Sequence, residues 1–158
     1  MELLPAPGLS IDEQLCFPLY AASNLMQRLY RPQLDGLGLT YPQYLVMLTM
    51  WESSPLSVSA LGDRLYLDSG TLTPLLKRLE SAGHITRTRD TADERRVLIA
   101  LTPPGRALRK KAKAIPADLL CRIGLPHSTL LALRDEIKQL VDQLESAIDT
   151  PLKTGTRP

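Results

Sequence analysis

The sequence predicts a mainly helical domain that carries one small β-hairpin, and three observations lead to that prediction. Apolar residues recur every three or four positions through most of the chain, which is the period of amphipathic helices. Two strand-length apolar or β-branched stretches, 85–89 and 97–101, flank a polar segment, which is the pattern of a hairpin. Apolar residues make up 44% of the 158 residues and charged residues 23%, which is enough to bury one core.

The N-terminal third of the chain is predicted to form two helices. Apolar residues recur with helical spacing over 11–29, and this helix is expected to end near Arg31-Pro32. Pro18 interrupts the pattern, because proline removes one hydrogen bond from a helix interior. Either the helix begins there or Cys16 lies on a weakened turn. The segment 42–51 is apolar on almost every side, which predicts a buried helix.

Two short helices are predicted next, at 58–64 and 69–81, with a brief turn between them. Ser57 precedes the first helix, and Asp68 or Ser69 begins the second. Such side chains accept hydrogen bonds from the free N–H groups of a first helical turn. Two helices joined in this way predict a helix-turn-helix.

The hairpin is followed by two more helices. Thr102 is expected to cap a basic helix that Pro116 kinks or breaks. The last helix is predicted at 128–149, and its apolar stripe fits an intramolecular core as well as a contact between subunits. The stripe consists of Leu130, Leu133, Ile137, Leu140, Leu144 and Ile148. Residues 1–8 and 150–158 are rich in Pro, Gly and Thr and are expected to be tails.

The charge is distributed unevenly along the chain. The net charge is +2, yet residues 77–113 hold 11 basic and 4 acidic side chains, a net charge of +7. Such a block is either a solvated basic face or a binding surface for a polyanion.

The helix at 69–81 favours the second interpretation. Its face opposite the leucines carries small and polar residues early and basic residues late, namely Gly70, Thr71, Thr73, Pro74, Lys77 and Arg78. Small hydroxyl side chains allow close approach to base edges, and the cations can bind phosphate or guanine. The hairpin adds four arginines, Arg87, Arg89, Arg95 and Arg96, and an arginine at a hairpin tip suits a narrow minor groove. The order of elements thus predicts a winged helix-turn-helix that binds double-stranded DNA.

Several classes of protein are excluded or disfavoured by what the sequence lacks. It has no transmembrane run, secretory signal, Gly-rich phosphate loop, HExxH or GxSxG, so we expect a cytoplasmic protein, no membrane association, and no enzyme recognisable by motif. Two cysteines make no disulfide framework, and a structural metal site is not expected with only His84 and His127. We expect neither a metal nor a cofactor.

Four stretches resemble a known family. "LYLDSGTLTPLLKRLE" followed by "DERRVLIALTPPG" resembles the MarR family of winged-helix repressors. "QLCFPLY" and "LTYPQYLVMLTMWE" resemble the organic-hydroperoxide-resistance repressors within that family. The similarity covers about residues 9–149.

The resemblance implies a single domain over 1–158 that dimerises through 9–31 and 103–149 and binds DNA through 42–102. It implies a homodimer that recognises an inverted-repeat operator, with half-sites about 34 Å apart. The residues that match the family's recognition helix are Ser69, Thr71, Thr73, Lys77 and Arg78. Arg95 matches the minor-groove arginine of the wing, and Asp93 matches the acid that supports it.

The two cysteines have a structural and a chemical interpretation. A cytosolic cysteine is most often a small buried apolar residue. The sequence around Cys16, however, matches that of the peroxide-reactive cysteine in the resembled family. In that family two tyrosines of the other subunit reach the reactive cysteine, and these tyrosines match Tyr30 and Tyr41. Cys121 matches the resolving cysteine of the two-cysteine subclass. The remaining tyrosines, like Trp51, are expected to be packing residues.

The resemblance therefore implies a transcriptional repressor that binds operator DNA when reduced and dissociates when an organic hydroperoxide oxidises Cys16. An intersubunit disulfide with Cys121 would follow. Two alternatives remain open at this point. One is a repressor of the same fold that senses a bound phenolic ligand, and the other is a helical thiol peroxidase that uses Cys16 and Cys121.

Overall fold

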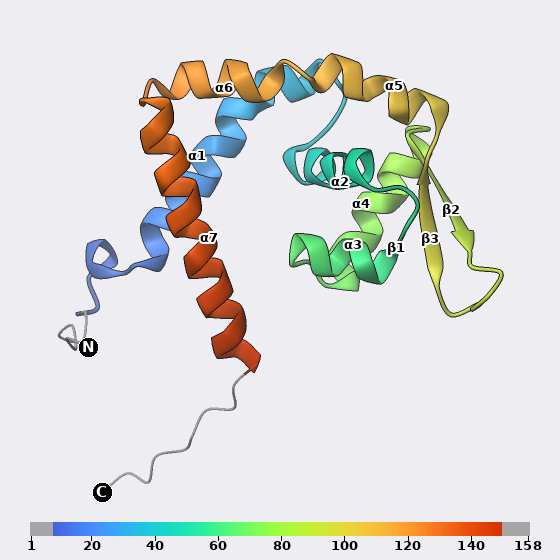
Figure 1. Cartoon of the computed structure of the whole chain (residues 1–158), viewed down its shortest axis with the longest axis horizontal. Helices are drawn as coiled ribbons and strands as arrows, with labels where there is room; N and C mark the ends of the chain where they lie inside the picture. The colour runs from blue at the N-terminus through green and yellow to red at the C-terminus, as the bar shows by residue number, and fades with distance from the viewer. Residues whose placement is uncertain (1–7, 150–158) are drawn as a thin grey trace, which may run out of the picture. The chain divides into compact units, whose positions relative to one another are not determined.

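A computed structural model describes residues 8–149 and confirms the mainly helical winged-helix fold (Figure 1). The chain divides into two compact units after Ile115. The helices are η1 (Ile11–Glu13), α1 (Cys16–Asp35), α2 (Tyr41–Glu52), α3 (Val58–Leu65), α4 (Ser69–Ser81), α5 (Pro103–Ala112), α6 (Ile115–Ile123) and α7 (His127–Asp149); the strands are β1 (Leu56–Ser57), β2 (Ile85–Arg89) and β3 (Val97–Leu101). Of the expected tails, all but Gly8 lie outside the described residues.

The first helix differs from the prediction at both ends. Helix α1 begins at Cys16, so Pro18 is its third residue, where a backbone N–H has no partner within the helix and proline is tolerated. The expected end near Arg31-Pro32 is wrong, because α1 continues through Pro32 to Asp35. Leu34 is only 2% exposed, and its burial holds the last turn in place despite the hydrogen bond that Pro32 cannot make.

Side-chain caps begin four helices of the first unit. Thr40 and Gln43 form a reciprocal capping box at the start of α2, in which the Thr40 N–H donates to Gln43 Oε1 over 2.8 Å. The predicted caps Ser57, Asp68 and Thr102 are confirmed, since each accepts a hydrogen bond from a backbone N–H of the following first turn.

The sheet has one strand more than the sequence predicts. Its order is β1-β3-β2, and both pairs are antiparallel. The hairpin pairs Ile85 with Leu101 at its base and Arg89 with Val97 near its tip, as the two stretches predict. Strand β1 was not predicted, because two residues are too few to show an alternating pattern.

Helix α2 lies at the centre of the core of the first unit. Its buried residues include Tyr44, Val46, Met47, Met50 and Trp51, and leucines of α3 and α4 and isoleucines of the sheet pack in the same cluster. Trp51, predicted as a core residue, is 9% exposed, and its indole N–H donates to the carbonyl oxygen of Gly105 over 2.9 Å. A Cβ on Gly105 would overlap the His84 carbonyl oxygen, so glycine is required where α5 meets the base of β2.

The second unit holds α7, which has no buried residue. Four of the six residues of its apolar stripe are exposed in a single chain, namely Leu133 (46%), Ile137 (38%), Leu144 (51%) and Ile148 (83%), and the other two are partly exposed. No helix within residues 8–149 is long and apolar enough to cross a membrane.

Candidate functional site

Helix α4 presents the polar face that the sequence predicts. Leu72, Leu76 and Leu79 are buried, and this fixes the opposite face toward solvent. Lys77 and Arg78 are exposed on that face, and neither forms an ion pair with another described residue. Both cations are therefore available to an anionic ligand.

The side chain of Thr71 also takes part in the N-terminal cap of α4, a role that the sequence pattern did not predict. Asp68 accepts from the Thr71 backbone N–H over 2.8 Å and from its hydroxyl over 2.9 Å. These two bonds, the backbone one first, lower the pKa of the Asp68 carboxyl below its usual value. The hydroxyl of Thr71 thus helps to cap α4. Ser69 is exposed and Thr73 half-buried on the same helix.

The turn between α3 and α4 is tight. Tyr66 ends α3 in the left-handed conformation with a φ of 54°, and it is 64% exposed. A Cβ on Gly62 would lie 2.7 Å from the Leu67 carbonyl oxygen, a contact too close to keep. Glycine at this position therefore lets the turn after Tyr66 pack directly against α3.

Two aspartates build the tip of the β2–β3 hairpin. Asp93 Oδ1 accepts from the Arg95 backbone N–H over 3.0 Å, and Asp90 Oδ1 accepts from the Ala92 N–H over 2.9 Å. Arg96 lies 3.7 Å from the Asp90 carboxylate, whereas the exposed Arg95 forms no ion pair among the described residues. Asp93 therefore contacts the backbone of Arg95, and the guanidinium of Arg95 extends freely from the tip.

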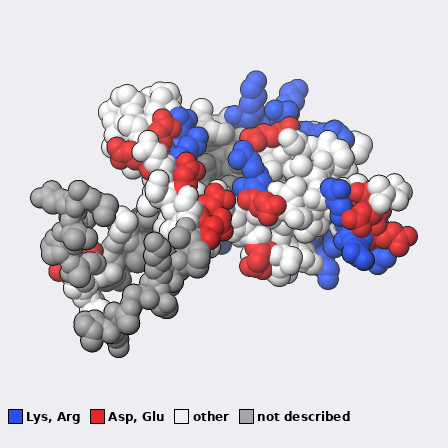
Figure 2. Space-filling view, turned by 60° about the horizontal axis from the view of Figure 1, so that its bottom comes forward, with Lys and Arg blue, Asp and Glu red and all other residues white. Residues whose placement is uncertain are grey.

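The other hairpin arginines are not equivalent. Arg87 pairs with Glu80 of α4 over 3.7 Å and is only partly exposed, whereas Arg89 is exposed and forms no ion pair within the described residues. Figure 2 shows basic side chains over the hairpin at the right of the view, mixed with the acidic side chains of its tip. Arg89 and Arg95 are thus the hairpin's available cations.

Three tyrosines form a cluster where α1 meets α2. The ring of Tyr30 lies 5.1 Å from that of Tyr41 and 5.7 Å from that of Tyr44, measured between centroids. Burial, followed by the neighbouring Tyr41 and Tyr44, raises the pKa of Tyr30 to about 12, and burial also raises the pKa of Tyr41. Both phenols therefore stay protonated near neutral pH. Within residues 8–149 neither hydroxyl forms a hydrogen bond, so both remain available as donors.

The structure separates the other tyrosines. Tyr44 is 1% exposed and is a packing residue as predicted. Tyr20 is 67% exposed and Tyr66 is 64% exposed, so the packing role predicted for these two tyrosines is wrong within a single chain.

Cys16 is the first residue of α1 and is exposed. It precedes Tyr30 by 14 residues on the same helix, so the two lie about 21 Å apart along the helix axis. The tyrosine pair therefore cannot contact the cysteine of its own chain. Cys121 lies on α6 in the second unit and is also exposed, so neither cysteine has the buried packing role of the structural interpretation.

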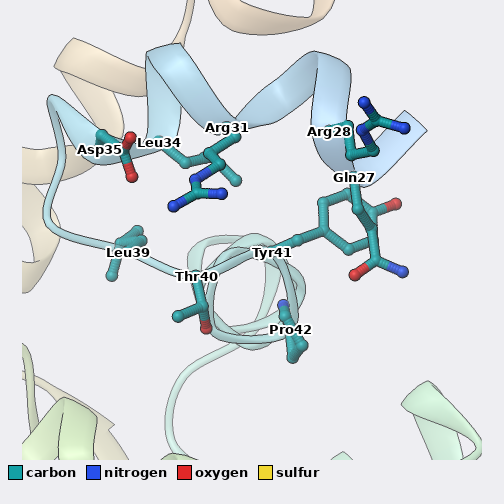
Figure 3. Close-up of a pocket in the computed structure, with 9 residues that line it drawn as sticks. All are labelled: Gln27, Arg28, Arg31, Leu34, Asp35, Leu39, Thr40, Tyr41 and Pro42. Atoms are coloured by element: carbon teal, nitrogen blue, oxygen red, sulfur yellow. The ribbon is translucent and has the colours of Figure 1, made fainter. Parts of the chain in front are cut away.

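A hollow of about 390 Å³ lies beside Tyr41, between the C-terminal half of α1 and the start of α2 (Figure 3). Arg28 and Arg31 line it, and the sequence analysis did not predict them. Their spacing of three residues, which places two cations on one helix face, was the available signal. The remaining lining residues are Gln27, Leu34, Asp35, Leu39, Thr40, Tyr41 and Pro42.

Metal ligands do not gather in the described part of the chain. No group of three His, Cys, Asp or Glu side chains there is arranged to hold a metal ion. His84 lies between α4 and β2, where its carbonyl oxygen accepts from the Thr102 N–H over 3.1 Å, and His127 begins α7.

Comparisons with known proteins agree with this geometry. The MarR family model matches residues 39–97. An organic hydroperoxide resistance transcriptional regulator of Bacillus subtilis is 47% identical over 92% of this chain and 92% of its own. The transcriptional regulator TtmR of Methylorubrum extorquens is 49% identical over 87% of this chain and 70% of its own.

Solved structures give the same result. Reduced AbfR bound to DNA has a TM-score of 0.71 and 36% identity, covering 85% of this chain and 94% of that one. AbfR with a disulfide formed has a TM-score of 0.60 and also 36% identity, covering 83% and 92%. AbfR comes from Staphylococcus epidermidis. With the helix-turn-helix, the wing and these relatives in agreement, the chain belongs to the MarR family of transcriptional regulators.

Proposed function

We propose that this protein is a repressor that binds operator DNA when reduced and releases it when an organic hydroperoxide oxidises Cys16. The observation that carries the proposal is the adjacent pair of Tyr30 and Tyr41, whose phenol hydroxyls have no partner in the described chain. Tyr30 lies about 21 Å along α1 from the cysteine of the same chain. In the proposed dimer these hydroxyls donate hydrogen bonds to the Cys16 sulfur of a second copy of the chain. The relative from Bacillus subtilis, which is named for organic hydroperoxide resistance, supports the same function.

The second copy binds through the helices at both ends of the chain. Leu15 is 69% and Leu25 60% exposed on α1, and the stripe on α7 is exposed too. An apolar surface of this kind normally marks an interface. We assign 9–31 and 103–149 to dimerisation and 42–102 to DNA binding, within one domain over 1–158.

In the dimer, each α4 enters a major groove and each wing a minor groove. On the major-groove side, Lys77 and Arg78 supply the cations, and Ser69 and Thr73 lie near the base edges. Thr71 contributes its methyl group, because its hydroxyl donates to Asp68. Arg95 enters the minor groove from a tip whose backbone Asp93 fixes. Two-fold symmetry requires an inverted-repeat operator, with half-sites about 34 Å apart.

The reaction is a two-electron oxidation of one sulfur. The Cys16 thiolate attacks the terminal oxygen of the hydroperoxide; the O–O bond breaks, the sulfur becomes a sulfenic acid, and the organic part leaves as an alcohol after taking up a proton. The thiol of the partner's Cys121 then attacks the sulfenic sulfur, forming a disulfide and releasing water. Closing a disulfide requires Cα atoms within about 7 Å. If the two Cα atoms lie farther apart than this in the reduced dimer, closing the bond shifts helices and changes the spacing of the two α4 helices.

A gel-shift assay tests the function. Organic hydroperoxide at micromolar concentration releases the operator, a thiol reductant restores binding, and Cys16→Ser binds DNA but ignores peroxide. A Cys16→Ser variant that still responds would instead support the sensing of a phenolic ligand. Continuous consumption of peroxide with a recycling thiol, without operator binding, would support a thiol peroxidase. We expect one oxidation per cysteine, and therefore no enzyme activity.

The role of Cys121 is tested by mixing two variants. A dimer of one Cys16→Ser chain and one Cys121→Ser chain keeps a single Cys16–Cys121 pair, which lies across the subunits. After peroxide treatment, non-reducing electrophoresis shows a covalent dimer in the mixture and none in either variant alone. Absence of that band from the mixture would remove the intersubunit disulfide from the mechanism.

A further inference from the structure

Helix α5 carries a stripe of positive charge along its exposed side. Its buried residues Leu108 and Ala112 pack toward the core. At 3.6 residues per turn, four exposed cations fall within about 100° of arc on the side away from these two residues, and they form the α5 stripe: Arg106, Arg109, Lys110 and Lys113. No acidic residue occurs between residues 103 and 113, and none of the four cations forms an ion pair within residues 8–149.

The α5 stripe faces away from the surface that is proposed to bind the operator. Helix α5 packs against α2 and β3, and α2 also packs against α3 and α4. In Figure 1, α5 lies at the top of the first unit, α2 lies below it, and α3 and α4 lie below α2. The hairpin joins α5 at its base, so the 5 residues of β3, about 17 Å, separate its tip from α5. A duplex held by α4 and the tip therefore leaves the α5 stripe uncovered.

The composition of the α5 stripe favours a nucleic acid over a protein or a membrane. An interface with a folded protein has an apolar centre, and a membrane-bound helix inserts apolar side chains. None of the large apolar residues that are exposed in the described chain lies on α5. Duplex DNA, by contrast, presents a phosphate about every 3.4 Å along each strand, so roughly three phosphates of one strand span the stripe's length of ~10 Å.

We propose that the α5 stripe binds the backbone phosphates of a second DNA duplex, so that a dimer on its operator holds another DNA segment at the same time. Burying unpaired cations between subunits is costly, so the stripe of each chain stays outside the dimer contact. The binding is independent of sequence, because phosphates carry no sequence information. This second DNA surface goes beyond the proposed function and does not depend on the oxidation of Cys16.

The test loads reduced dimer with one equivalent of unlabelled operator and titrates this complex into a fluorescent non-operator duplex, whose anisotropy reports binding. Since the operator occupies α4 and the hairpin, only a second surface binds the labelled duplex. Affinity varies as the salt concentration to the power of about −0.9 for each phosphate contact, so each contact contributes roughly 30-fold at about 20 mM salt. Four contacts give a dissociation constant of about 1 μM, and binding should disappear at about 200 mM salt.

Two double variants that each remove two positive charges are compared. Arg109→Gln/Lys113→Gln removes half of the α5 stripe and should weaken binding of the labelled duplex by more than about a hundredfold. Lys111→Gln/Lys138→Gln removes an exposed cation of α5 outside the stripe and one of α7, and should bind nearly as wild type does. Operator affinity at about 150 mM salt, where distant charges are screened, should be unchanged in both variants, which also shows that they are folded.

Four results would overturn the proposal. The wild-type complex does not bind the labelled duplex, both variants weaken its binding equally, or Arg109→Gln/Lys113→Gln loses operator affinity, which would place the stripe on the operator itself. In the fourth, a labelled poly-glutamate peptide binds the complex more tightly than the duplex does, which would indicate an acidic protein partner. Failure of the operator itself to bind would refute the proposed function, whereas the difference between the two variants in binding the labelled duplex would still decide the role of the stripe.

Discussion

Removing one phenol hydroxyl should slow the oxidation of Cys16 by a predictable amount. Tyr30→Phe and Tyr41→Phe each leave the ring in place and delete a donor that has no other partner in the described chain. A hydrogen bond to a charged group contributes roughly 1.5–3 kcal/mol, and every 1.4 kcal/mol is about tenfold in rate. We therefore expect each variant to react about 10- to 100-fold more slowly, because the hydroxyls stabilise charge on the sulfur and on the departing oxygen.

Tyr44→Phe is the matched control. Tyr44 belongs to the same aromatic cluster and its pKa is also raised, but it is only 1% exposed and cannot reach a second chain. The assay follows the loss of the Cys16 thiol after rapid mixing with excess cumene hydroperoxide, in a Cys121→Ser background. Wild-type rates in both test variants, or equal slowing by Tyr44→Phe, would refute the reasoning.

Three further predictions concern DNA binding and stability. Arg95→Ala should weaken operator binding and lower by about one the slope of log affinity against log salt concentration. Arg96→Ala, which loses an ion pair to Asp90, should change that slope less. Fluorescence anisotropy at several salt concentrations measures both slopes. Gly105→Ala should lower the free energy of unfolding in urea by about 1–3 kcal/mol, through overlap with a backbone carbonyl. Since the pKa of Tyr30 is raised from 10.0 to about 12, stability should be level up to pH 10 and fall toward pH 12, and less so in Tyr30→Phe.

The sequence predicts those elements that have a local signal. Helix α4 is marked by its cap at Asp68 and its leucine spacing, and the hairpin by two apolar stretches around a polar tip. The end of α1 has no such mark, because burial of Leu34 outweighs the cost of Pro32. Strand β1 exists only because Leu56 pairs with Ile99, a partner 43 positions away.

In the candidate site, too, some features could be predicted from the sequence and others could not. The position of Lys77 on a polar face follows from helical period, whereas the bond that occupies the Thr71 hydroxyl depends on a side-chain rotamer. The contact between Tyr30 and Tyr41 joins two helices, and no spacing along the chain reveals it. The hollow lined by Arg28 and Arg31 forms only where the start of α2 lies against α1.

The central claim is that oxidation of Cys16 causes release of the operator, and one titration tests it directly. Operator-bound protein receives increasing organic hydroperoxide, and each sample is divided between a gel-shift lane and mass spectrometry after alkylation of the free thiols. The fraction of DNA released should rise together with the fraction of oxidised Cys16. Release while Cys16 remains fully alkylated, or complete oxidation with the operator still bound, would contradict the account.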